Sequence, residues 1–482
     1  MNKKYLYFLL IPFVLSGCVN KTNSNKTNNA NKDDVGFIKE DVSIDFLCMA
    51  DARYLNKLKE IVEDFESTEP HVKVNLSNPL GSGNYAMLEN SVVAGYFKGN
   101  HPDIVQCYPD NVVKYISRGF ALELDKYLDN PQYGIKENGE NDYIEAFLKE
   151  GANYTVKGTY SLPFCKSTEL MYYNADVLLG LNLPGINDNN PLDEQYLDSL
   201  TWEELFDNLC PALKNYNDSL NDNEKILKSS DNSAFFTYDS DENFFITLAN
   251  QYGYGYTSID ENGHGSIDFD NDGMKTLVKK MKAAKDAGYL QTKGTYHTYV
   301  SSLFQNQQAL FTISSTASII YNYNEDKPFT VGVAHIPYAK GKGYLSINQG
   351  PSVCILDHNN ENRALASYLL WRHMTNKTNS LDWALYTGYM GIRKSSYEDQ
   401  KYKDALVVED KTDLYKLLQA ENLNKIAEVS SYTFNTSVFK GSSNARTNVG
   451  LLLRNCLLSD GADETIDNLF KESSDEAKSH LS

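Results

Sequence analysis

The sequence predicts an α/β protein with two domains. Strands and helices alternate along most of the chain, which is the pattern of sheets covered by helices. The chain has 482 residues, of which roughly 440 are expected to fold, and that length exceeds the usual core of one domain. Beyond the N-terminal leader, no stretch approaches 18 consecutive apolar residues, so no further membrane span is expected.

The N-terminal part begins the alternation of strands and helices. Apolar, β-rich residues predict a strand over 42–49, and apolar residues at helical spacing predict a helix over 55–67. A second strand is expected at 72–76, a helix at 85–97 and a third strand at 102–106. This order predicts a parallel, doubly wound sheet.

The same alternation returns in the rest of the chain. Thr201 followed by Glu204 forms a capping box that begins a helix. Further strands are predicted at 160–163, 171–174, 309–314 and 329–335, and helices at 201–213, 243–252, 274–287, 363–374 and 381–386.

The N-terminus has the pattern of a bacterial lipoprotein signal. Two lysines precede an apolar run that is too short to span a bilayer, and Leu-Ser-Gly-Cys at 15–18 matches a lipobox. We interpret residues 1–17 as a signal peptide and Cys18 as the site of acylation, which would anchor the protein to the outer face of the cell membrane. An ordinary secretory signal with a chance cysteine is the alternative. Residues 18–41, rich in Asn, Lys, Thr and Ser, are expected to form a disordered tether.

Charge and cysteine spacing exclude several classes of function. The net charge of −19 argues against nucleic acid as a partner, because such partners need a concentrated basic face. The six remaining cysteines are widely spaced, with no CxxC pair and no spacing typical of metal ligands. We therefore expect no metal and no cofactor.

Two acidic features of the sequence are candidate sites. Residues 268–273 read DFDNDG, the opening of a calcium loop, but Lys279 stands where the loop needs a bidentate Glu. A helix cap before Met274 explains the segment better. Carboxylates are plentiful, so a catalytic carboxylate pair is not excluded by counting.

Four segments, in order, resemble the extracellular solute-binding proteins of ABC importers, in the group that binds sugars. The likeness spans about 42–400. It rests on IDFLCMADARYLNKLKEIVEDFESTEPHVKVNL with PDIVQCYPDNVVKYISRGFALELDKYL, on GTYSLPFCKSTELMYYNADVL, on LTWEELFDNL, and on ALFTISSTASI through QGPSVCIL to WALYTGYMGIRKSSYE.

The resemblance implies a two-lobe periplasmic-binding-protein-like fold with a hinge and a ligand cleft between the lobes. Lobe one is expected over 42–157 and 309–357, and lobe two over 158–308 and 358–480. The implied function is capture of a carbohydrate and its delivery to ABC permease subunits by a monomer that performs no chemistry. The alternatives are a surface carbohydrate-active enzyme with a carboxylate pair and a surface adhesion lipoprotein.

The family positions imply which residues reach the cleft. A sugar presents an apolar C–H face to aromatic rings and hydroxyls to fixed hydrogen-bond partners. The expected ligand-binding residues are Asp51, Tyr85, Ser167, Trp202, Asp239, Gly350, Tyr389 and Arg446.

Several of these residues also have a plainer interpretation. Trp202 either stacks on a sugar ring or fills the core at a helix start, and Ser167 either donates to a hydroxyl or forms a turn. Asp51 and Asp239 either bridge two hydroxyls or are simply solvated. Arg446 either grips an anionic sugar or makes a surface salt bridge.

The sequence departs from the family pattern in two places. Met390-Gly391 replaces a hydrophobic residue followed by Pro, and Ala86 stands where glycerol-phosphate binders carry Glu. The second departure argues against glycerol phosphodiesters as ligands.

Overall fold

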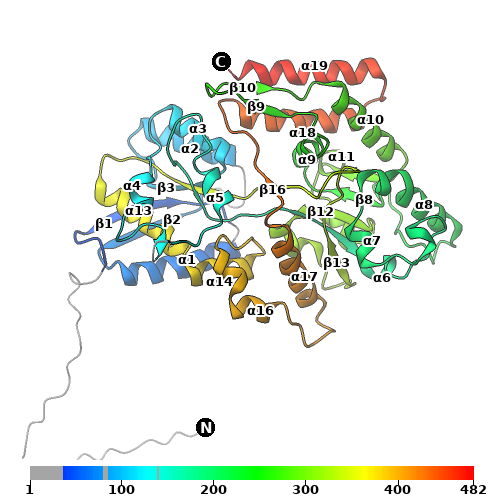
Figure 1. Ribbon diagram of the computed structural model, residues 1–482, viewed down its shortest axis with the longest axis horizontal. Coiled ribbons are helices and arrows are strands. Elements are labelled where there is room, and N and C mark those ends of the chain that lie inside the picture. The colour runs from blue at the N-terminus through cyan, green and yellow to red at the C-terminus, as the bar shows by residue number, and fades with distance from the viewer. Residues whose placement is uncertain (1–35, 51, 80–84, 138–139, 482) are drawn as a thin grey trace, which may run out of the picture.

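The computed structural model describes residues 36–50, 52–79, 85–137 and 140–481. Figure 1 shows two sheets side by side, each covered by helices, with the chain passing between them more than once. The expected two-lobe α/β fold is confirmed. The predicted signal peptide and Cys18 lie outside the described residues.

The first lobe is built on a five-stranded sheet with the order β2-β1-β3-β15-β6. β1 pairs in parallel with β2 and β3, as predicted, whereas β15 runs antiparallel to β3 and β6. The strand bounds are Val42–Leu47 for β1, Val72–Ser77 for β2, Ile104–Cys107 for β3, Leu162–Pro163 for β6 and Ser352–Ile355 for β15.

Helix α1 (Ala52–Thr68) shows why the sequence pattern was informative. Its buried residues are Leu58, Ile61, Val62 and Phe65, which recur at intervals of three and four and so share one face. α1 packs against α13 (Glu361–Met374), which also covers β1. The other elements of this lobe are α2 (Tyr85–Phe97), α3 (Pro109–Ser117), α4 (Asp125–Leu128), β4 (Lys136–Glu137), β5 (Glu140–Asn141), α5 (Glu145–Glu150), α14 (Lys377–Thr387), α15 (Lys394–Glu398) and α16 (Gln400–Ala405).

The second lobe is built on a five-stranded sheet with the order β11-β8-β12-β7-β13. β7 runs antiparallel to both of its neighbours, while β8 pairs in parallel with β12 and β11. The strand bounds are Glu169–Asn174 for β7, Phe236–Tyr238 for β8, Leu290–Thr292 for β11, Phe311–Ser315 for β12 and Val331–Ala334 for β13.

Helices α9 (Asp241–Tyr252), α10 (Asp272–Asp286), α18 (Ser442–Leu458) and α19 (Asp463–Ser479) pack together on this lobe (Figure 1). The other elements here are α6 (Ala175–Leu178), the 3₁₀ turn η2 (Asn187–Asn189), α7 (Glu194–Asp198), the π-helical turn η3 (Glu204–Leu209), α8 (Cys210–Ser219), β9 (Thr257–Ile259), β10 (Gly265–Ile267), α11 (Lys293–Tyr296), α12 (Ser301–Gln305), the 3₁₀ helix η4 (Thr316–Asn322), β14 (Ser346–Ile347), α17 (Leu414–Val429) and β16 (Thr433–Phe434).

The sheet membership differs from the expected lobe boundaries in two places. Residues 309–357 were expected in lobe one, but β12 and β13 pair with β7 in the second sheet, and only β15 joins the first. Residues 358–480 were expected in lobe two, but α13 packs on the first sheet, where Arg363 Nε and one terminal nitrogen each donate to Asp103 at 2.6 Å. Strand pairing depends on contacts between distant segments, which local periodicity does not report.

The predicted tether also ends earlier than expected. Ile38 is 2% exposed, and the backbone N–H groups of Phe37 and Ile38 donate to the buried carboxylate of Glu69. The segment from residue 36 is therefore packed on the first lobe. Within the described residues, no helix has the length and apolarity needed to cross a membrane.

The two lobes are joined by connections that run side by side. Ser167, between β6 and β7, exchanges two backbone hydrogen bonds of 2.9 Å with Gln349, between β14 and β15. Cys165 N also donates to Pro351 O at 3.0 Å, and a third connection leads from α16 to α17. Paired crossing strands are a natural hinge, because a small backbone rotation in both moves one sheet relative to the other.

Candidate interlobe binding site

A cavity of about 410 Å³ lies between the lobes, beside the paired crossing strands. This volume falls within the range of small-molecule sites. The residues that line it come from both lobes: Tyr85, Glu89, Tyr108, Pro109, Asp110, Asn111, Lys114 and Glu150 from the first, Glu169, Asp239, Ser240, Glu242, Asn243, Lys293, Tyr299, Ser314, Ser315, Ser318, Thr436, Val438, Ser443, Arg446 and Thr447 from the second, and Asn348, Gln349 and Gly350 from a crossing strand.

Gly350 brings two backbones together at the floor of the cavity. Its φ is +95°, and a Cβ at this position would stand 2.0 Å from the carbonyl oxygen of Cys165. Only glycine meets both conditions without strain. Directly behind it, the buried Lys166 donates to Glu150 and, at 3.2 Å, to Gly350 O, so a charge pair supports the crossing strands.

Tyrosines from both lobes provide apolar surfaces. Tyr85 meets Tyr108 edge to face with ring centroids 4.7 Å apart. Burial, followed by the neighbouring Tyr108 and Tyr389, raises the pKa of Tyr85, so its hydroxyl stays protonated and able to donate. Across the cavity, Tyr299 is 59% exposed and carries the Lys293 ammonium 4.0 Å from its ring centroid.

Two carboxyl groups of the cavity are hard to ionise. Burial raises the pKa of Glu169 to about 7, even though Tyr238 donates to one of its oxygens and Asn243 to the other. Burial also raises the pKa of Asp239 to about 7, although Val300 N donates to it at 3.0 Å. Both groups therefore change charge close to neutral pH.

Arg446 is enclosed rather than free. It donates to Asn243 Oδ1, and Asn243 Nδ2 in turn donates to Glu169 and Gln349. Burial acts to lower the pKa of Arg446, but the nearby Glu242 and other groups raise it, so the guanidinium remains charged. The arginine holds the amide network of the second lobe together.

Four of the expected ligand-binding residues line the cavity together: Tyr85, Asp239, Gly350 and Arg446. Ser167 is 3% exposed and lies in the crossing strand behind the wall. Tyr389 is partly buried, with its ring centroid 6.3 Å from that of Tyr54. Asp51 lies outside the described residues.

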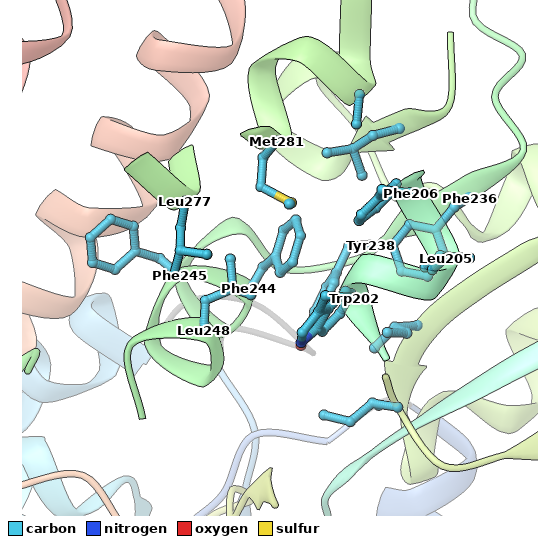
Figure 2. Close-up of a cluster of buried hydrophobic side chains, with 14 of the residues drawn as sticks. Trp202, Leu205, Phe206, Phe236, Tyr238, Phe244, Phe245, Leu248, Leu277 and Met281 are labelled. Atoms are coloured by element: carbon cyan, nitrogen blue, oxygen red, sulfur yellow. The ribbon is translucent and has the colours of Figure 1, made fainter. Parts of the chain in front are cut away.

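Trp202 belongs to the core of the second lobe (Figure 2). It is 2% exposed, and its ring packs against Phe206 and Phe244. Its indole N–H donates to Gln251 Oε1 at 2.7 Å. Of its two interpretations, this placement matches a core aromatic at a helix start and provides no platform at the cavity. The expected cap is present, since Glu204 N donates to Thr201 Oγ1 at 3.1 Å.

Other lining residues were not singled out from the sequence. Tyr108 and Asp110 directly follow β3, at the carboxyl end of a parallel strand, where ligands of α/β proteins commonly bind. Their position after a predicted parallel strand could have identified them from the sequence. Asn348, Lys293 and Thr447 carried none, because only the packing of distant segments brings them to the cavity.

Comparison with known proteins identifies the family of this chain. A family model described as bacterial extracellular solute-binding protein matches residues 60–408. The chain belongs to this family, as the sequence resemblance implied. No curated protein sequence matches the chain.

Solved structures share the fold at low sequence identity. UgpB from Mycobacterium tuberculosis, in complex with glycerophosphocholine, is 17% identical with a TM-score of 0.69, covering 91% of this chain and 98% of that one. An ABC substrate-binding protein from Listeria monocytogenes, in complex with cycloalternan, is 14% identical with a TM-score of 0.67, covering 91% and 99%. The maltose/maltodextrin-binding domain MalE from Bdellovibrio bacteriovorus, bound to maltotriose, is 14% identical with a TM-score of 0.64, covering 91% and 100%.

Proposed function

We propose that this protein captures a carbohydrate in the interlobe cavity and passes it unaltered to an ABC permease. The observation that carries the proposal is a cavity lined by both lobes, with tyrosine rings and a dense set of hydrogen-bonding side chains. Rings of this kind pack on the C–H faces of sugars, and the polar groups match hydroxyls. The carbohydrate complexes of structurally similar proteins support the same ligand class.

Closure of the lobes is the expected response to ligand. A ligand that contacts both walls binds the closed form better than the open form and shifts the equilibrium by that difference in affinity. The lobe-to-lobe contact between Asp110 and Ser442 Oγ, at the ends of α3 and α18, is one that closure would form. Small-angle scattering should show a smaller radius of gyration with ligand, and an unchanged radius would argue for a rigid adhesion protein.

Attachment through Cys18 completes the proposal. A lipid anchor would keep the lobes near the permease at the outer face of the membrane. Cys18→Ser should release the protein into the medium of cells that export it, while the native chain stays in the membrane fraction. Release of both forms would contradict the anchor without affecting ligand capture.

Calorimetry against a panel of mono- and oligosaccharides tests the binding function. We expect saturable heat with at least one member, and Tyr299→Ala should weaken that binding roughly tenfold, because the exposed ring lines the cavity. Tyr321→Ala is the matched control, since Tyr321 is 54% exposed and does not line the cavity. An inert panel would contradict the carbohydrate assignment.

The alternative of a carbohydrate-active enzyme has one observation in its favour. Glu169 and Asp239 both line the cavity with a pKa of about 7, the property of a general acid. Both are held by structural hydrogen bonds, however, to Tyr238 and Asn243 in one case and to Val300 N in the other. Chromatography of the bound sugar over hours distinguishes the two functions, because any product would overturn the binder.

A further inference from the structure

The contact between Asp110 and Ser442 joins the two lobes directly. Asp110 lies in the first turn of α3 in the first lobe, and Ser442 is the first residue of α18 in the second. The Ser442 hydroxyl donates to Asp110 Oδ1. Ser442 is 4% exposed and is not among the residues that line the interlobe cavity. Rotation about the crossing strands would separate the two side chains, so this hydrogen bond belongs to the closed form.

The N-terminus of α18 has no negative group of its own. Its N-cap is Gly441, which has a φ of +97° and no side chain to accept a hydrogen bond, and its first turn contains no acidic residue. The first N–H groups of a helix lack partners within the helix, and together they act as about half a positive charge. A carboxylate next to them is stabilising, and Asp110 of the opposite lobe provides one.

Asp110 is available to α18 because a different residue caps α3. Asn111 Oδ1 accepts from the backbone N–H of Tyr108 at 2.9 Å, which is the capping contact of α3. Within the described part of the chain, the Asp110 carboxylate has one hydrogen-bond partner, the Ser442 hydroxyl. The carboxylate is therefore directed at the second lobe rather than at its own helix.

Arg446 strengthens the attraction between Asp110 and α18. Burial raises the pKa of Asp110, whereas the Ser442 hydrogen bond and the positive charge of Arg446 lower it. Asp110 in turn acts to raise the pKa of Arg446, which also lies in α18. Glu89 opposes the charge on Asp110, but Lys114 pairs with Glu89 at 2.6 Å. The second lobe thus presents two positive groups, a helix end and a guanidinium, to one carboxylate.

The lobes also approach each other beside this contact. Gly263, in the turn between β9 and β10 of the second lobe, lies so close to the first lobe that an added Cβ would stand 2.9 Å from Thr155 Cβ. A second cavity of about 360 Å³ lies here, and its mainly apolar lining includes Val113 of the first lobe and Phe439 of the second. α3 lines the first cavity with Asp110 and the second with Val113, so the contact with α18 lies along the seam between the lobes.

We propose that Asp110 and Ser442 form a latch that holds the lobes closed, and that this latch scales the affinity for every ligand by the same factor. The inference rests on the proposed closure of the lobes and goes beyond carbohydrate capture, because it requires no particular ligand. The apparent dissociation constant of a protein that binds only when closed is the intrinsic constant divided by the closed fraction. A contact between protein groups changes only that fraction, so both side chains act as positioning residues.

Ser442→Ala tests the latch, because it removes the hydrogen bond and leaves the lining of the interlobe cavity unchanged. A hydrogen bond to a charged group is strong enough for its loss to lower the closing constant at least about tenfold. Small-angle scattering without added ligand should give a larger radius of gyration where the closed form predominates in the native protein. Where the open form predominates, calorimetry with glucose, cellobiose, maltotriose and N-acetylglucosamine should show the same loss of about tenfold for every sugar that binds.

Two further variants separate a latch from a general loss of stability. Ser219→Ala removes a hydroxyl that donates to Tyr216 O at 2.6 Å within one lobe, so it should change neither the radius nor any affinity. Asp110→Asn keeps an acceptor for Ser442 but removes the charge that suits the helix end, so it should increase the radius in the same direction as Ser442→Ala. Urea unfolding of each variant checks that the lobes remain folded.

The outcomes separate the latch from the proposed function. An unchanged radius together with unchanged affinities in Ser442→Ala would overturn the latch and leave carbohydrate capture standing. A loss of affinity for some sugars and not for others would also overturn it, because that pattern indicates a contact with the ligand itself. If no sugar binds, carbohydrate capture is overturned and the radius alone decides: a larger radius supports the latch, and an equal radius overturns it.

Discussion

The free energy of unfolding should depend strongly on the buried charge pair of Lys166 and Glu150, which supports the crossing strands. The side chains of Lys166 and Glu150 are 0% and 7% exposed, and the ammonium donates to the carboxylate. In Lys166→Met the carboxylate stays buried without its cation, which costs about 3–5 kcal/mol in comparable pairs. The contacts left to Glu150, from Ser352 Oγ and Asn348 Nδ2, are both 3.4 Å long and compensate little.

The double variant Lys166→Met with Glu150→Leu measures the interaction energy between the two side chains. Because an apolar pair of similar volume replaces both charges, its free energy of unfolding should return to within roughly 1 kcal/mol of the native protein. Urea unfolding followed by circular dichroism measures all three free energies, and equal slopes would show that the unfolded states are comparable.

The same helix offers a matched control. Lys149 pairs with Glu145 at 2.8 Å, but both side chains are more than 70% exposed. Lys149→Met should change the free energy of unfolding by no more than the error of the measurement, because water screens an exposed pair. If Lys166→Met lowered the free energy of unfolding by less than about 1 kcal/mol, the Glu150 carboxylate would not depend on Lys166, and the reasoning would be wrong.

Three further predictions concern single residues. Trp202→Phe should lower the free energy of unfolding by about 1–3 kcal/mol, because the hydrogen bond to Gln251 is lost. Ligand affinity measured by calorimetry should stay within twofold. A large loss of affinity without a loss of stability would instead support a stacking role for Trp202. Gly350→Ala should lower the melting temperature and ligand affinity together, because the new Cβ meets Cys165 O and forces the crossing strands apart; normal values of both would contradict this. The folded pKa of Asp239 is raised to about 7, so its contribution to stability is present below about pH 4 and is lost as pH rises through 7. Asp239→Asn should therefore flatten the fall in melting temperature between about pH 4 and pH 8, and identical profiles would refute the shift.

Element prediction succeeded where the pattern was local. The helix at 85–97 matches α2, and the strand at 72–76 differs from β2 by one residue. Thr201 caps its helix as expected, but the helix continues through a π-helical turn before Pro211. Proline removes a backbone donor and crowds the preceding turn, which explains the irregularity.

Site prediction succeeded only in part, for a different reason. Tyr85 and Gly350 were identified by family position and do line the cavity. Trp202 was identified in the same way, yet its ring faces the core. A motif gives the position of a residue along the chain, whereas the direction of its side chain depends on what the neighbouring segments leave open.

The sequence by itself determined the elements, the α/β class, the family and the acidic charge, because these depend on local periodicity, short motifs and composition. Only the tertiary structure decided that β12 and β13 belong to the second sheet and that Arg446 is bound within an amide network. It also brought the carboxylates to one cavity and left Asn348 Oδ1 without a donor. Strand partners, enclosed charges and unpaired acceptors depend on contacts between residues that are far apart in the sequence, so they exist only in the folded chain.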